Sequence, residues 1–192
     1  MRPIRDASEE EMVLAFLLGE IDSRRFACVR EALADPSLVT DADLSDAAAN
    51  DRRRDILTAC RGYETRTDLF DGFPQRVAWK LVEVTTKELG NFRYVRIEPW
   101  TELAPSRLVS DGARNETSIA EGVNEHIRAI VVTIQAGKKF PWLIAAAEGE
   151  HECHHLIEGH ARATAMVRTR SPHWTERVIV GYVPDLSKWR WR

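Results

Sequence analysis

The stretches before and after Gly90 have different local sequence patterns, and this contrast limits the folds open to the chain. Before Gly90, apolar residues recur at helical spacing behind capping signals. After it, short β-branched and aromatic runs alternate with helix-forming runs, which is typical of strands connected through helices. The sequence therefore predicts an α+β protein, in which a helical region over residues 1–90 precedes a mixed-sheet domain over residues 91–192.

The helical region shows start and stop signals for four helices. Ser, Asn and first-turn Pro mark helix starts, and Gly or a following Pro marks helix ends. Helices are predicted after a capping box formed by Ser8 and Glu11, from about Ser23 to before Pro36, from an Asn50 cap to Gly62, and from Pro74 to Gly90.

The second half alternates between strand and helix signals. A β-branched stretch at Ile130–Ile134 leaves a strand open as an alternative within the long helical pattern. The expected order is a strand over Phe92–Trp100, a helix from about Ile119 to Ala136, two strands joined by a turn around Gly149, a helix directly after Gly159, and a strand over Val178–Val183.

The net charge of −3 is unevenly distributed along the chain. Residues 1–90 hold 13 Lys and Arg against 18 Asp and Glu, a balance of −5, whereas residues 91–192 hold 14 against 12, a balance of +2. The second half is therefore the better host for a small anionic ligand. So small an excess does not indicate a nucleic-acid surface.

The three cysteines and the length of the apolar runs indicate the cellular compartment of the protein. Cys28, Cys60 and Cys153 are widely spaced and odd in number, which favours a reducing compartment over a disulfide framework. Cys28 and Cys60 fall on helical patterns as small buried residues. No apolar run approaches the roughly 20 residues that span a bilayer, and no signal-peptide pattern follows the first arginines. We expect a cytoplasmic protein that does not enter a membrane.

The segment 151–160 holds four of the six histidines and one cysteine. On a strand, alternate residues share a face, so His151, Cys153 and His155 would project together as zinc ligands, with His160 as a fourth. The CxxC spacing of common zinc sites does not occur. A solvated polar strand face is the alternative interpretation.

The segment LIEGHARATA at 156–165 indicates a strand that turns at glycine into a helix. Glycine permits a sharp turn, and the free N–H groups of the helix start can bind an anion. Arg162 lies on the first helical turn, where it can make a charge-assisted contact. Glu158 and His160 flank the turn as candidate acid–base groups. A purely structural junction is the alternative.

These residues, Leu156 to Ala165, resemble the signature of the ParB/sulfiredoxin superfamily, in which a strand enters a (D/E)-G-H-x-R or G-E-R-R turn that opens a helix. The resemblance covers about residues 92–183 and includes a loose match of Arg107 to an early arginine of ParB. It departs from ParB at Ala163, where ParB has a second arginine, and from sulfiredoxin at Gly159, where sulfiredoxin has its reactive cysteine.

The resemblance implies roles for individual residues. Gly159, Ala161 and Arg162 would bind nucleotide phosphates, and Glu158 and His160 would orient a metal or move a proton. ParB-like kinases have a second histidine where this chain has Ala161. Phosphoryl transfer also uses Mg²⁺ held by carboxylates, for which Glu102, with Glu98, is the candidate.

Three functional hypotheses result. The first is an enzyme that uses a nucleotide such as ATP, ADP or CTP with Mg²⁺ for phosphoryl transfer or hydrolysis. The second is a non-catalytic module that senses a nucleotide or another anion, with the helical region binding a protein partner or a second copy of the chain. The third, a nuclease-like protein acting on DNA, has little support from the charge.

Overall fold

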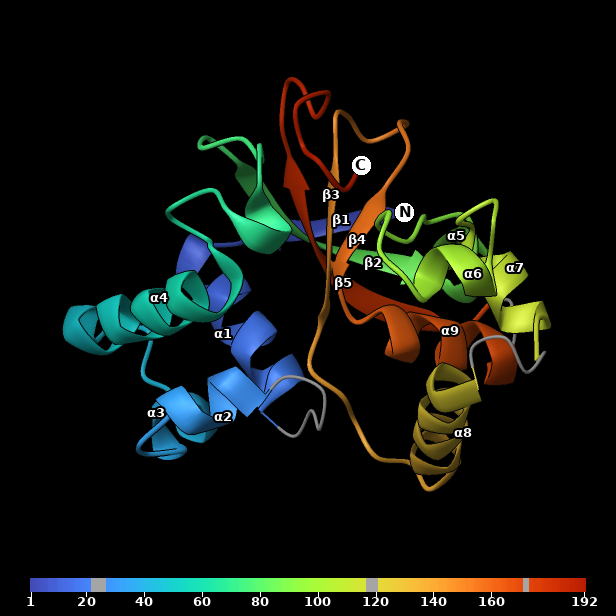
Figure 1. The fold of residues 1–192 in the computed structure, drawn as a ribbon, viewed down its shortest axis with the longest axis horizontal. Coiled ribbons are helices and arrows are strands. Elements are labelled where there is room, and N and C mark those ends of the chain that lie inside the picture. Colours follow the sequence, from blue (N-terminus) through green and yellow to red (C-terminus); the bar gives the residue numbers. More distant parts are fainter. Residues whose placement is uncertain (22–26, 117–120, 171–172) are drawn as a thin grey trace.

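A computed structural model of the protein describes residues 1–21, 27–116, 121–170 and 173–192 (Figure 1). Helices and strands are mixed along the whole chain. Their order is β1 (Arg2–Asp6), α1 (Glu9–Glu20), α2 (Ala27–Ala32), α3 (Ser37–Thr40), α4 (Ala47–Arg61), the 3₁₀ turn η1 (Asp68–Phe70), β2 (Ala78–Thr85), α5 (Thr86–Leu89), α6 (Trp100–Leu103), α7 (Val109–Arg114), α8 (Glu121–Gln135), β3 (Leu143–Ala147), β4 (His155–Glu158), α9 (His160–Thr169) and β5 (Thr175–Tyr182).

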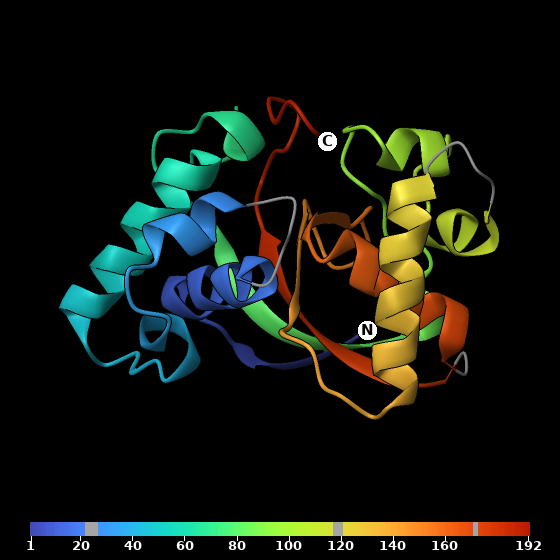
Figure 2. The ribbon, with the colours of Figure 1, turned by 60° about the horizontal axis from the view of Figure 1, so that its bottom comes forward.

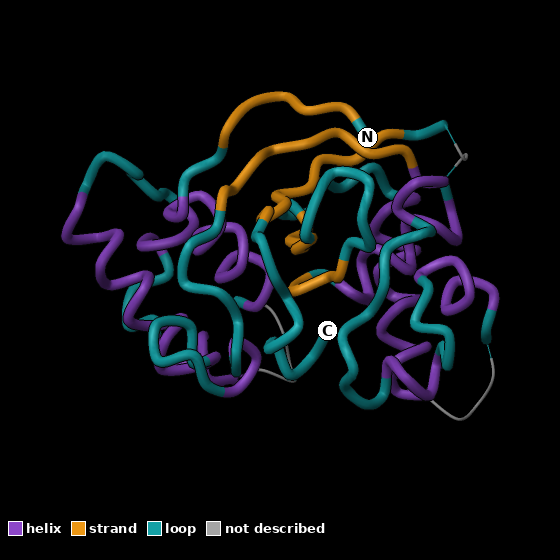
Figure 3. The backbone as a smooth tube through the Cα atoms, turned by 90° about the horizontal axis from the view of Figure 1, so that it is seen from above, coloured by secondary structure: helices purple, strands orange, loops and turns teal. Residues whose placement is uncertain are grey.

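Within the described residues, five strands form one mixed sheet in the order β1-β2-β5-β3-β4. β2 pairs antiparallel with β1 and β5, β5 pairs parallel with β3, and β3 pairs antiparallel with β4. The α+β class is confirmed. The strands are drawn in orange in Figure 3. β1 and β2 come from the first ninety residues, so both halves of the chain contribute to the same sheet (Figure 1).

Helices cover both faces of this sheet. α1 to α4 lie on one side and α6 to α9 on the other (Figures 1 and 2). In β3 the side chains alternate between two apolar cores: Ile144 and Ala146 pack with α1 and α4, whereas Leu143, Ala145 and Ala147 pack with α8 and α9. Burial on both faces explains why β3 is a continuous apolar run.

The helix predicted from Pro74 to Gly90 is wrong. Residues Ala78–Thr85 form β2, and only Thr86–Leu89 are helical. β2 sends Trp79 and Leu81 into one core and Val82 and Val84 into the other. Because both faces of β2 are buried, its sequence lacks the alternation of apolar and polar residues that marks a half-exposed strand. Pairing with β5 along its whole length determines that the segment is a strand.

Two further boundaries differ from prediction. α4 begins at Ala47 with Asp46 as its cap, and Asn50 lies inside the helix, where its side chain donates to the Leu44 carbonyl. Residues 92–99 form no regular strand: Arg93 makes isolated bridges to Leu108 and His155. The segment is extended, but it is too irregular for a continuous ladder.

The remaining predicted elements are confirmed. Ser8 and Glu11 form the capping box of α1, and Gly62 ends α4 in the left-handed conformation. α8 is helical through Ile130–Ile134, which removes the strand alternative. The predicted starts at Ser23 and Ile119 lie outside the described residues. In the part of the chain that is described, no helix is both long and apolar enough to cross a membrane.

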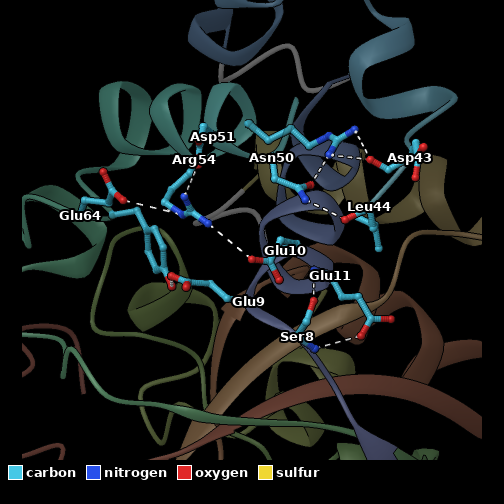
Figure 4. A network of polar contacts seen from close by, with 12 residues as sticks. Ser8, Glu9, Glu10, Glu11, Asp43, Leu44, Asn50, Asp51, Arg54 and Glu64 are labelled. Atoms are coloured by element: carbon cyan, nitrogen blue, oxygen red, sulfur yellow. Dashed lines mark hydrogen bonds and ion pairs between the residues drawn. The ribbon is translucent and has the colours of Figure 1, made fainter. Parts of the chain in front are cut away.

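A polar network fixes α1 against α4 (Figure 4). Arg54 on α4 contacts Asp51 at 2.8 Å, Glu10 on α1 at 3.5 Å and Glu64 at 3.7 Å. One arginine therefore connects both helices and the loop after α4. The position of α1 matters for function because its last residues, Gly19 and Glu20, line a cavity beside the β4–α9 junction.

Cys28 on α2 and Cys60 on α4 form a disulfide. The interpretation of these residues as separate buried thiols is therefore wrong, and cysteine usage no longer supports a reducing compartment. The two positions are 32 residues apart in sequence, and their Cα atoms are 5.7 Å apart. The distance that permits the bond is set by the packing of α2 on α4, which the spacing in the sequence does not reveal.

The disulfide leads to a first prediction. Replacing Cys28 and Cys60 by serine should lower the free energy of unfolding by about 2–4 kcal/mol, because the cross-link restricts the unfolded chain. Urea denaturation of the oxidised protein and of the double variant measures the difference. Cys153→Ser, at the free cysteine, is the control and should change stability little. Equal stability of oxidised wild type and double variant would contradict the prediction.

Candidate functional site

A cavity of about 400 Å³ lies between the end of α1, the η1 turn, α8 and the β4–α9 junction. This volume lies within the range of small-molecule sites. Its wall combines apolar side chains with a concentration of ionisable ones. The ionisable residues are Glu20, Arg61, Asp68, Glu98, His126, Glu158, His160 and Arg162.

The start of α9 forms one wall of this cavity. Gly159 adopts φ +92° and caps the helix without a side-chain hydrogen bond. The first intrahelical bond runs from Ala163 N–H to the Gly159 carbonyl at 2.8 Å. The amides of residues 160–162 precede that bond and point out of the helix start, where they can donate to a ligand.

Arg162 is held by groups of the protein itself. Its guanidinium donates to Glu158 Oε1 at 2.9 Å and to the Pro141 carbonyl at 2.6 Å, and the residue is 6% exposed. Gly19 on α1 faces this pair, since a Cβ there would lie 2.6 Å from Arg162 Nη2. Arg162 therefore links α9 to β4 and to the segment before β3, and it packs against α1 rather than standing free in the cavity.

A second ion pair lies beside the first. Arg61 donates from Nε and Nη2 to Glu20 Oε1 at 3.0 and 2.6 Å, and Glu20 is 2% exposed. Burial, together with the negative charge of Glu158, raises the pKa of Glu20 to about 7, although Arg61 opposes the rise. Glu20 is thus a carboxylate that can exchange a proton near neutral pH.

His160 is held by aromatic stacking. Its ring lies 5.2 Å from that of Trp100 and 5.9 Å from that of Tyr94. The Tyr94 and Thr164 hydroxyls are 2.6 Å apart, and Thr164 donates to the His160 carbonyl at 2.7 Å. Burial raises the pKa of Tyr94, so its hydroxyl stays protonated and fixes this wall.

The structure brings together most of the predicted site residues. Glu98, which the sequence predicts together with Glu102 as a magnesium ligand, also lines the cavity. Glu102 is exposed on α6 and does not line it. The predicted residues in the cavity wall are Glu158, Gly159, His160, Ala161 and Arg162.

The histidine–cysteine cluster does not lie on one strand. β4 begins only at His155; His151 lies in an exposed turn, and Cys153 precedes the strand. The shared strand face that would present three zinc ligands is therefore absent. Among the described residues, no three His, Cys, Asp or Glu side chains are grouped to hold a metal ion.

Half of the ionisable groups in the cavity wall were not indicated by the sequence. Glu20, Arg61 and Asp68 belong to the helical region, and His126 lies on α8. None of them is part of a motif. The first three reach the cavity because α1 packs on the sheet beside the β4–α9 junction, α4 packs on α1, and η1 packs on α4.

Comparisons of the chain with protein-family models, curated proteins and solved structures found no match. The resemblance to the ParB/sulfiredoxin superfamily therefore stays a prediction from the residues around Gly159. Function has to be inferred from the geometry and charge of the cavity.

Proposed function

We propose that this cavity binds a nucleotide together with Mg²⁺ and that the protein uses it for phosphoryl transfer or hydrolysis. The observation that supports the proposal is that the start of α9, whose first N–H groups have no acceptor within the helix, meets four carboxylates around one cavity. Helix starts favour phosphate because their N–H groups and the helix dipole stabilise negative charge.

The charges of the cavity explain why Mg²⁺ is part of the proposal. Among the described residues of the cavity wall, four carboxylates face two arginines, and these arginines are already paired with Glu20 and Glu158. A phosphate alone would be repelled. Mg²⁺ is usually held by one or two carboxylates plus phosphate oxygens, so it requires no ready-made group of three ligands. Glu98 and Glu158 are the proposed carboxylates, and the ion would neutralise charge on the transferred group.

Glu20 is the proposed proton acceptor, in addition to His160, while Glu158 holds the ion. A general base works best when its pKa is close to the working pH, and that of Glu20 is raised to about 7. Arg61 fixes the direction of the carboxylate through three hydrogen bonds. Since the base must be deprotonated, turnover should rise as the pH increases through about 7.

The main competing hypothesis is a nucleotide-sensing module without turnover. The observation that favours it is the ion pair between Arg162 and Glu158. An enzyme would need Arg162 to bind phosphate and Glu158 to hold the metal ion, and the ion pair occupies both side chains. Binding of the ligand is common to both hypotheses, so turnover separates them.

We expect Mg²⁺ with ATP, ADP or CTP to raise the melting temperature of the protein. Glu98→Gln should weaken nucleotide affinity about tenfold, because it removes one charged partner of the ion. Thermal-shift titration measures affinity, and phosphate release measures turnover between pH 5.5 and 8.5. Glu98 is exposed, so the substitution does not threaten the fold.

Glu102→Gln is the matched control, since Glu102 is exposed on α6 outside the cavity. It should leave affinity and turnover unchanged. Binding without turnover would select the sensing module. If none of the three nucleotides raised the melting temperature, the proposed nucleotide site would be overturned. If Glu98→Gln and Glu102→Gln lost the same amount of nucleotide affinity, the nucleotide would not bind in this cavity.

A further inference from the structure

Four arginines gather at the far end of β4 from the cavity, and we call them the arginine cluster: Arg93, Arg96, Arg107 and Arg192. Backbone hydrogen bonds between distant segments bring them together. Arg93 bridges Leu108 and His155, Tyr94 N–H donates to the Arg107 carbonyl at 2.8 Å, and Arg96 N–H donates to the Trp191 carbonyl at 2.9 Å. The backbone segments that carry the four arginines are therefore held side by side by the fold.

The cluster lacks matching negative charge. Arg192 is paired with Glu148 through two contacts, at 2.8 and 2.9 Å. In the described part of the chain, Arg93, Arg96 and Arg107 form no ion pair with a carboxylate. Arg107 is only 8% exposed, and its guanidinium makes a single long hydrogen bond, 3.4 Å to the Tyr94 carbonyl. A largely buried arginine with so few protein partners is costly unless an anion joins it.

Two buried nitrogen atoms in or beside the cluster have no hydrogen-bond partner among the described residues. They are Arg93 Nε and His155 Nδ1, and His155 is 3% exposed. Buried polar atoms of native proteins are nearly always satisfied, so each such atom requires an explanation. A bound oxyanion with several acceptor oxygens would satisfy both.

Electrostatics within the cluster agree with this geometry. Burial and the positive charges of Arg96 and Arg93 lower the pKa of Arg107. Burial and the charges of Arg107, Arg192 and Arg93 lower the pKa of His155 to about 3. His155 is therefore neutral and can donate one N–H, while the arginines around it repel one another until an anion is present.

We propose that the arginine cluster binds a phosphate-type oxyanion, either free phosphate or the terminal phosphate of a small molecule. A tetrahedral dianion offers acceptors to several guanidinium groups at once, which suits Arg107 with Arg93 and Arg96. This site differs from the cavity at Gly159. None of the four arginines lines that cavity, and the surplus charge of the cluster is positive where that of the cavity is negative.

The test is a thermal-shift titration with sodium phosphate against sodium chloride at equal ionic strength. Wild-type protein should melt at higher temperature as phosphate increases. Arg107→Gln and Arg96→Gln should each weaken phosphate binding about tenfold or more. Arg96 is exposed, so Arg96→Gln should fold like wild type. This variant can therefore test phosphate binding even if Arg107→Gln does not fold. In the absence of phosphate, Arg107→Gln should not lower the melting temperature, because it removes a buried charge with no counterion.

Arg52→Gln is the control, since Arg52 is exposed on α4 away from the cluster, and its phosphate response should equal that of wild type. Glycerol 3-phosphate is the second probe: tighter binding than phosphate assigns the site to a phosphate ester, and weaker binding assigns it to the free ion. Glu98→Gln should retain the response, which separates this site from the cavity. A phosphate response absent from wild type, or fully kept in both arginine variants, would overturn the proposal.

Discussion

Arg162→Met is expected to lower the free energy of unfolding by about 3–5 kcal/mol, because it leaves the Glu158 carboxylate without its partner in a nearly buried position. The two side chains are 7% and 15% exposed and 2.9 Å apart. The substitution also frees the Pro141 carbonyl, which accepts from Arg162 at 2.6 Å. Urea denaturation measures the loss.

Two further variants test the cause of this loss. Glu158→Gln combined with Arg162→Met should recover a large part of the stability, since no unpaired buried charge remains. Arg2→Met is the matched control: it breaks the Arg2–Glu83 pair, in which Arg2 is 70% exposed, and should cost no more than about 1 kcal/mol. A loss for Arg162→Met as small as that of the control would contradict the structural role of the pair.

The features that the sequence predicted correctly are local ones. The Ser8–Glu11 box, the Gly62 helix end and the Gly159 turn each depend on a few adjacent residues whose backbone geometry their side chains favour. Glu158, Gly159 and Arg162 are likewise close together in the sequence, which explains why the sequence predicted that they lie in one site.

The features that the sequence did not predict depend on contacts between distant segments. β1 carries no apolar pattern, because Arg2–Asp6 is an exposed edge strand that is defined by its pairing with β2. β2 has both faces buried and therefore lacks a clear alternation of apolar and polar residues. In each case tertiary pairing, rather than local propensity, determines the structure.

Long-range contacts also limited the prediction of the site. Glu20 and Arg61 enter the cavity only because α1 packs on the face of the sheet that borders the β4–α9 junction and α4 packs on α1. The histidines of the segment at 151–160 were prominent in the sequence, yet their backbone turns before β4 begins and disperses them. Composition identified a cluster, whereas the fold decided which of its members meet.

Gly159→Val is expected to lower the free energy of unfolding by about 3–5 kcal/mol and the melting temperature by about 6–20 °C. At φ +92°, a β-branched residue is strained whatever space surrounds it. Space is lacking as well, since a Cβ would lie 2.4 Å from Leu143 Cδ2 and 3.2 Å from Arg162 Nη2. The α9 start would have to move, and the amides that face the cavity would move with it.

Gly122→Val is the matched control for this prediction. Gly122 lies on α8, where a Cβ would meet nothing within 4 Å, and valine costs no more than glycine in a helix, so stability should change by no more than about 0.5 kcal/mol. Calorimetry of both variants separates conformational strain at Gly159 from a general effect of valine. If Gly159→Val had the same melting temperature as Gly122→Val, the left-handed turn at the β4–α9 junction would not be the conformation in solution. If it melted early but still bound Mg²⁺ and ATP with wild-type affinity, the amides of α9 would not be the phosphate-binding groups.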